Sequence, residues 1–212
     1  MVLIKEAGSI LPGLFLRDFI TIRIITFSII NENTTISTLS LAILGLITQK
    51  PRSGYDLRKV FSTTPMGHFS SSPGAIYPAL KRIEKNGWIR GSIDHNKALR
   101  PRRIYRITAK GLDALRQHLL QTVTQDDVIW RMDNLILRFA FMDEVLGREC
   151  TLKFLEEFLA ETKSHVCSLR QYQDQIKGII PATGRLAMEN GINNYEINAR
   201  WAERAIKELA KD

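Results

Sequence analysis

The stretch SSPGAIYPALKRIEKNGWIR, residues 71–90, has the pattern of a helix whose two sides differ sharply. At 100° per residue, Ile76, Leu80 and Ile83 share one face, which is the spacing of a buried side. The residues on or beside the opposite face are Gly74, Tyr77, Lys81, Arg82 and Lys85. The stretch therefore predicts an amphipathic helix that presents a small first turn, an aromatic ring and positive charge to a partner.

Residues at both ends of this stretch indicate where the helix begins and ends. Ser72 is a suitable N-cap, and Pro73 suits the first helical position because no N–H is needed there. Pro78 leaves only the Gly74 carbonyl without a donor, close to the helix start, so we expect a local bend rather than a break. Gly87 is the residue type usually found just past a helix C-terminus.

The flanking segments complete a known arrangement. Residues 38–49 are nearly all apolar and predict a helix buried at the centre of a domain. Ser53 is placed to cap a second helix, and Thr108 to cap a fourth. Between them, residues 88–94 and 102–108 predict two short strands. Three helices, a hairpin and a further helix predict a winged helix-turn-helix, an α+β unit within a mainly α protein.

The net charge of +8 is concentrated in one segment of the chain. Residues 37–123 hold 15 Lys and Arg against 4 Asp and Glu, a net charge of +11. Residues 124–212 hold 12 against 15, a net charge of −3, and residues 1–36 hold 3 of each sign. Such a local excess indicates a polyanionic partner, the alternative being a solvated basic surface.

Double-stranded DNA is the partner that this arrangement favours. The major groove of B-DNA admits one helix, and the N-terminal residues of that helix approach the base edges. A slim first turn permits close approach, and hydroxyls and cations can bind phosphates. The expected DNA-binding residues are Ser71, Ser72, Gly74, Tyr77, Lys81, Arg82 and Lys85 on the helix, and Lys97, Arg100, Arg102 and Arg103 on the hairpin. An RNA-binding or protein-docking winged helix is the alternative, since this scaffold serves several functions.

Enzymatic and metal-dependent functions are not expected. The four histidines, His68, His95, His118 and His165, are scattered without ligand spacing. We find no nucleophile elbow, phosphate loop or paired-carboxylate site. We therefore predict no catalytic residues, no metal and no cofactor.

The compartment is predicted from the cysteines and from the first 36 residues. Cys150 and Cys167 lack metal or redox spacing, which indicates reduced thiols in the cytoplasm. Residues 10–30 are apolar, but Arg17, Asp18 and Arg23 interrupt them, and each charge costs about 3 kcal/mol at mid-bilayer. Residues 1–36 are therefore interpreted as an apolar arm of uncertain role, with a membrane-tethered regulator as the alternative.

Residues 124–212 are predicted to form a helical dimerisation domain that follows the DNA-binding domain of residues 37–123. Apolar side chains recur there at alternating spacings of three and four, the pattern of packed helices. The expected dimer contacts are Val128, Met132, Leu135, Phe139, Tyr195, Ala199, Trp201, Ala202 and Ile206. Packing within one chain would use the same positions. A dimer is favoured because two-fold symmetric proteins bind two half-sites about 34 Å apart.

Several motifs in this order resemble the PadR family of bacterial transcriptional regulators. They are SGYDL (53–57), SPGAIYPALKRIEKNGWI (72–89) and RPRRIYRIT (100–108), followed by AKG. Residues 189–209 resemble the end of the longer helical C-terminal domain of that family. Leu99 departs from the family, which often has Gly before the Arg-Pro of the wing.

The resemblance implies a function as well as a fold. It implies dimerisation through the C-terminal helices and a small aromatic or other hydrophobic effector bound between the DNA-binding and helical domains. We accordingly predict a homodimeric, sequence-specific repressor whose operator binding is relieved by such an effector. Its response would come from a change in the distance between the two recognition helices.

Overall fold

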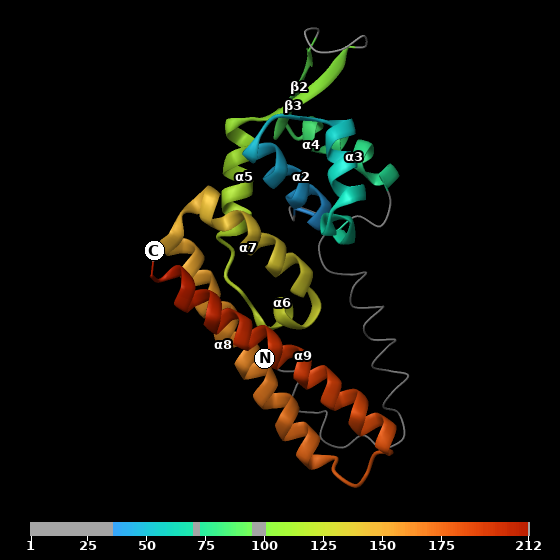
Figure 1. Ribbon diagram of the computed structural model, residues 1–212, viewed down its shortest axis with the longest axis vertical. Coiled ribbons are helices and arrows are strands. Elements are labelled where there is room, and N and C mark those ends of the chain that lie inside the picture. Colours follow the sequence, from blue (N-terminus) through green and yellow to red (C-terminus); the bar gives the residue numbers. More distant parts are fainter. Residues whose placement is uncertain (1–35, 70–72, 95–100, 212) are drawn as a thin grey trace. The chain divides into compact units, whose positions relative to one another are not determined.

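The computed structural model describes residues 36–69, 73–94 and 101–211 (Figure 1). The first elements are α2 (Thr38–Gln49), β1 (Arg52–Ser53), α3 (Gly54–Thr63), two 3-10 segments, η2 (Pro65–Phe69) and η3 (Pro73–Ala75), then α4 (Ile76–Lys85), β2 (Ile89–Asp94), β3 (Arg102–Ile107) and α5 (Ala109–Leu119). They are followed by α6 (Gln125–Trp130), α7 (Met132–Leu146), α8 (Arg148–Gln175) and α9 (Ala182–Leu209). The fold is mainly helical with a small antiparallel sheet, which confirms the predicted class.

Side-chain caps fix the starts of the helices where the sequence predicted them. The Ser53 hydroxyl oxygen accepts from the Asp56 N–H at 3.1 Å, and the Asp56 carboxylate accepts from the Ser53 N–H at 3.1 Å. At the start of α5, the Thr108 hydroxyl oxygen accepts from the Gly111 N–H at 3.0 Å. Each cap supplies an acceptor to an N–H that has no partner within the helix. Both predicted caps are confirmed.

The three strands are ordered β1-β3-β2, so β2 lies at an edge of the sheet. The β2–β3 hairpin pairs Ile89 with Ile107 at its base and is the predicted wing. Sequence analysis did not predict β1, in which Arg52 pairs with Tyr105. A strand of two residues has no periodicity to recognise.

The start of α4 differs from the prediction. The regular α-helix begins at Ile76, and a 3-10 turn, Pro73–Ala75, precedes it. Because Pro78 has no N–H for the Gly74 carbonyl, the α-helical hydrogen-bond ladder begins only after Gly74. Ser72, the predicted N-cap, lies outside the described residues.

The end of α4 agrees with the prediction. Gly87 has φ of 73°, the left-handed conformation that glycine adopts readily. Its N–H donates to the Glu84 carbonyl at 2.9 Å, and the Trp88 N–H donates to the Ile83 carbonyl at 3.1 Å. These two bonds satisfy carbonyls of the last turn and set the direction in which β2 departs.

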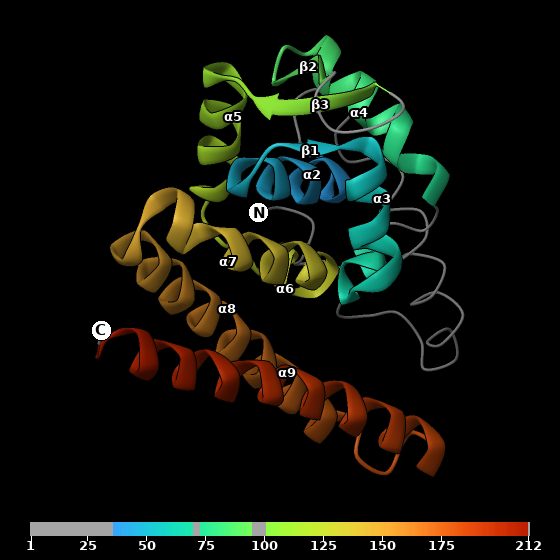
Figure 2. The same cartoon turned by 45° about the horizontal axis from the view of Figure 1, so that its top comes forward.

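Helix α2 lies at the centre of the hydrophobic core (Figure 2). Its residues from Ser40 to Ile47 are all buried, and it contacts α4, α5, β3 and α7. A Cβ atom on Gly45 would lie 2.4 Å from Cε2 of Phe141, so α7 packs directly on the α2 backbone. The core therefore continues from the winged helix into α7 and α8 without a break at residue 123.

The predicted dimer contacts lie mostly inside the single chain. Val128, Leu135 and Ala202 are at most 1% exposed, and Ala199 is 7% exposed. Met132, Phe139, Tyr195, Trp201 and Ile206 pack partly buried against the same core. These positions pack within one chain, and their direct contact with a second chain stays a prediction.

Aromatic side chains join α7, α8 and α9. The Trp201 ring packs edge-on against Phe139 at 5.1 Å and against Phe158 at 5.8 Å, measured between ring centroids. Farther along the α8–α9 pair, the His165 and Tyr195 ring centroids are 4.6 Å apart. Helices α8 and α9 thus pack along one another (Figure 1).

The predicted N-terminal arm, residues 1–36, lies outside the described residues except for Ile36. Within the described ranges, no helix combines the length and apolar character needed to cross a bilayer. Cys150 and Cys167 are free thiols.

A buried polar group joins α5 to α7. Arg138 of α7 is 2% exposed, and its guanidinium donates to the carbonyls of Leu119 and Gln121, the first at 2.9 Å. It therefore caps the C-terminal end of α5, where carbonyls lack helical partners. His118 is 6% exposed beside it. Burial, and then the positive charge of Arg138, lower the pKa of His118 from 6.5 to about 4.

The low pKa of His118 makes stability depend on pH. Between pH 6.5 and 4 the unfolded chain binds a proton that the folded chain excludes, so stability falls as the pH decreases through this range. We expect the free energy of unfolding to fall by about 2 kcal/mol between pH 7.5 and 5 from this group. Urea unfolding at both pH values measures it.

The control is the same pair of measurements on two variants. His118→Gln should lose most of this pH dependence. His165→Gln reports the share of His165, whose pKa burial also lowers. Full pH dependence in the His118→Gln protein would contradict the prediction.

Candidate nucleic-acid interface

Helix α4 separates an apolar face from a polar one, as the sequence predicted. Ile76, Leu80 and Ile83 are at most 1% exposed and pack in the core. Gly74, Tyr77, Lys81, Arg82 and Lys85 are all exposed. The exposed face carries three cations and one aromatic ring, so it is suited to a polyanion.

The Tyr77 ring is held in place although half of it is exposed. A Cβ atom on Gly54 would lie 2.7 Å from Cε1 of Tyr77, so the ring rests on the first turn of α3. The side chain remains 51% exposed. Gly54 is needed because any larger residue would displace this ring, and Tyr77 therefore presents a fixed aromatic edge.

Arg82 has an intramolecular role that the sequence did not indicate. Its guanidinium donates to the hydroxyl oxygens of Ser37 and Ser40, each at 3.2 Å. Ser37 is the N-cap of α2. Arg82 therefore ties α4 to the start of the central helix α2, and at most part of its guanidinium is available to a ligand.

One wing arginine packs on an aromatic residue of α3. The guanidinium carbon of Arg102 lies 5.6 Å from the ring centroid of Tyr55, a cation–π distance. Tyr55 is 56% exposed. Sequence analysis missed Tyr55, although it lies outside the helical spacing of Leu57 and Phe61, the buried apolar side chains of α3.

The other wing arginine is paired with an acid on α4. Arg103 donates to the Glu84 carboxylate at 2.7 Å, and the same oxygen accepts from the Gly91 N–H at 2.9 Å. The Arg103 hydrogen bond lowers the pKa of Glu84, and the same bond raises the pKa of Arg103. The Arg103 guanidinium also lies 5.8 Å from the ring centroid of Tyr105.

Four predicted DNA-binding residues are not placed. Ser71, Ser72, Lys97 and Arg100 lie outside the described residues. The structure brings the other seven onto α4, the turn before it and the adjacent strand β3.

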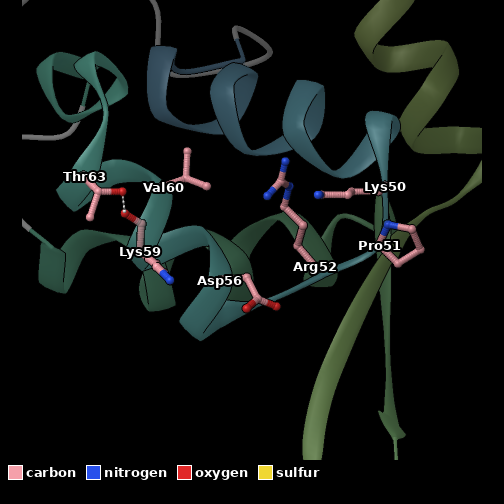
Figure 3. Close-up of a pocket in the computed structure, with 7 residues that line it drawn as sticks. All are labelled: Lys50, Pro51, Arg52, Asp56, Lys59, Val60 and Thr63. Carbon is pink, nitrogen blue, oxygen red and sulfur yellow. Dashed lines mark hydrogen bonds between the residues drawn. The ribbon is translucent and has the colours of Figure 1, made fainter. Parts of the chain in front are cut away.

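A second positive surface lies beside β1 and α3 (Figure 3). It is a hollow of about 470 Å³. Its lining residues are Lys50, Pro51, Arg52, Asp56, Lys59, Val60 and Thr63. Arg52 donates from Nε to the Leu46 carbonyl at 3.1 Å, so this arginine caps the end of α2. Among the seven, Asp56 alone is acidic, and its bond from Ser53 lowers its pKa.

The described ranges hold no group of three His, Cys, Asp or Glu side chains placed to bind a metal ion. His118 is enclosed in the core beside Arg138, and His165 packs against Tyr195. These two histidines therefore pack against other side chains of the fold.

Comparison with known proteins gives a family match and several structural similarities. Residues 43–117 match the sequence model of the transcriptional regulator PadR-like family. The comparison with curated proteins gives no match. The matched segment covers the winged helix from within α2 to near the end of α5.

Three similar solved structures come from Bacillus species. Bacillus subtilis PadR in complex with operator DNA is 20% identical, with 80% of this chain and 97% of that chain covered and a TM-score of 0.35. The PadR-like regulator BC1756 from Bacillus cereus is 25% identical, with coverages of 81% and 98% and a TM-score of 0.36. Bacillus subtilis PadR in complex with p-coumaric acid is 19% identical, with coverages of 85% and 100% and a TM-score of 0.35.

The fold and the sequence match point to the same class of protein for the winged-helix segment. A winged helix with an exposed basic helix is typical of DNA-binding regulators. Over residues 43–117 the chain is similar to the transcriptional regulator PadR-like family.

Lys81 and Lys85 generate a test of this interface. Each phosphate contact contributes about 0.9 to the slope of log affinity against log salt. Lys81→Ala and Lys85→Ala should each reduce that slope by about 0.9. The slope is measured by fluorescence anisotropy on duplex DNA over roughly 50 to 200 mM salt. Lys177→Ala, which removes an exposed charge between α8 and α9, is the matched control. An equal change of slope in all three variants would show that Lys81 and Lys85 of α4 do not contact DNA phosphates.

Proposed function

We propose that this regulator binds operator DNA as a homodimer and represses transcription, and that a small hydrophobic or aromatic effector releases it. The observation that carries the proposal is the exposed face of α4, where Tyr77, Lys81 and Lys85 project from a helix whose other face is buried. Arg102 and Arg103 of the wing lie beside it. A helix of this kind reads bases in the major groove, while a wing contacts the adjacent backbone.

The contact between two copies would involve an exposed stripe of α9. Leu186 and Ile197 are each 54% exposed. They are eleven residues apart, so they lie within about 20° of one another around the helix. Asn190 and Asn193 occupy the same side between them. This stripe adds to the predicted dimer positions, because its side chains are exposed in the single chain and available to a second one.

The effector would act where the winged helix meets α7 and α8. Arg138 donates there to the end of α5, and α7 packs on α2 through Phe141 and Gly45. A ligand changes DNA affinity only by binding two arrangements of the recognition helices unequally. The corresponding measurement is the release of bound DNA when small aromatic compounds are added, beginning with p-coumaric acid. A cytoplasmic location belongs to the same proposal.

The experiment that tests DNA recognition is selection of binding sites from a random duplex pool, followed by footprinting of the selected site. We expect an enriched sequence with two-fold symmetry and two protected half-sites about one helical turn apart. Single-stranded RNA of the same length is the competitor for the alternative function. Enrichment of no duplex sequence, or stronger competition by RNA, would contradict the proposal.

The experiment that tests the dimer is sedimentation at micromolar concentration. The wild-type chain of 24.2 kDa should sediment with twice that mass. Ile197→Lys should shift the equilibrium toward the single chain, because a charge would replace an apolar contact. Leu120→Lys, at another exposed leucine, should have no effect. A wild-type protein that sediments as a single chain would contradict the dimer.

A further inference from the structure

The negative charge of Glu84 opposes the proposed binding of DNA. It is the acidic residue of α4, and it lies in the segment that carries the positive excess. A carboxylate near a DNA surface repels phosphates. The position of Glu84 must therefore be explained by what its side chain contacts.

One oxygen of Glu84 joins two parts of the wing to the recognition helix. Oε1 accepts from the Gly91 N–H at 2.9 Å and from the Arg103 guanidinium at 2.7 Å. Strand β2 lies at an edge of the sheet, and its Gly91 N–H donates to this carboxylate from outside the β2–β3 pair. Glu84 thus binds one residue on each strand of the hairpin.

The packing around this oxygen leaves no free space at Gly91. A Cβ atom at this position would lie 2.3 Å from Nε of Arg103, 3.0 Å from Oε1 of Glu84 and 3.0 Å from Cε1 of Tyr105. Arg103 therefore lies across the bare backbone of β2, between Glu84 and the Tyr105 ring. Its side chain is still 53% exposed, so it can contact an anion while paired.

We propose that Glu84 is a positioning residue for DNA recognition, which fixes the angle between wing and recognition helix and orients Arg103 toward the duplex. The proposal rests on the proposed function, since it concerns how two DNA-contacting elements are held in register. A wing held at a fixed angle contacts the DNA backbone at one position, which is the position it takes when the helix makes the correct base contacts. The consequence is that Glu84 increases the preference for the specific site over other DNA, although its charge lowers affinity for any DNA.

The test compares affinities for the selected duplex and for a scrambled duplex of equal composition. Loss of two charge-assisted hydrogen bonds in Glu84→Ala should weaken specific binding at least about tenfold. Scrambled DNA should bind equally well or more tightly, because one negative charge is gone. Glu84→Gln keeps an acceptor oxygen and should recover much of the preference.

The matched control is Asp113→Ala, which removes an exposed acid from α5 without touching the wing. Its two affinities should change together, so the ratio of specific to scrambled binding stays at the wild-type value. An unchanged or higher ratio in Glu84→Ala would overturn the proposal and favour a purely electrostatic role.

A measurement without DNA separates failure of this proposal from failure of the proposed function. Hydrogen exchange of the Gly91 amide should become about tenfold faster in Glu84→Ala and stay slow in Glu84→Gln, relative to amides of α5. Equal exchange in wild type and Glu84→Ala would show that the carboxylate does not hold the wing. A wild-type chain that selects no duplex, with Gly91 exchange as expected, would refute DNA recognition but leave the contact intact.

Discussion

Burial of α2 is the constraint on which the rest of the structure depends. Eight consecutive residues of this helix, from Ser40 to Ile47, are removed from water. A helix that is apolar on nearly every side needs partners on nearly every side. The winged helix supplies α4, α5 and β3, and the C-terminal part supplies α7. Because Phe141 lies directly against Gly45, α4 and the C-terminal helices pack on the same central helix. Movement of one is therefore coupled to the packing of the other.

The cations of the winged helix differ in how firmly they are held. Lys81 and Lys85 are exposed on α4, whereas Arg82 bonds to the start of α2. Arg102 lies on Tyr55, and Arg103 is paired with Glu84. Arginine suits these tethered positions, since its planar group can stack or bond on one side and still donate on another. The lysines supply charge, and the arginines also fix geometry.

Much of the fold was predictable because its signals are local. Caps at Ser53 and Thr108, the apolar run of α2 and the faces of α4 each depend on residues within a few positions of one another. The two-residue strand β1 and the bond from Arg82 to Ser37 depend on contacts between distant segments, which periodicity does not encode. The same limit explains the dimer positions. The alternating spacing of three and four residues around Leu135 and Ala202 correctly indicated packed helices. It did not specify whether the packing partner belongs to the same chain or to a second one.

The central claim is that the exposed side of α4 faces DNA, and site-specific photo-crosslinking tests it most directly. A photoreactive amino acid at position 81 would replace an exposed side chain on that face, and the same group at position 177 would lie between α8 and α9. With a bound duplex, position 81 should cross-link to DNA and position 177 should not. Cross-linking at 177 with none at 81, while both proteins still bind the duplex, would contradict the account.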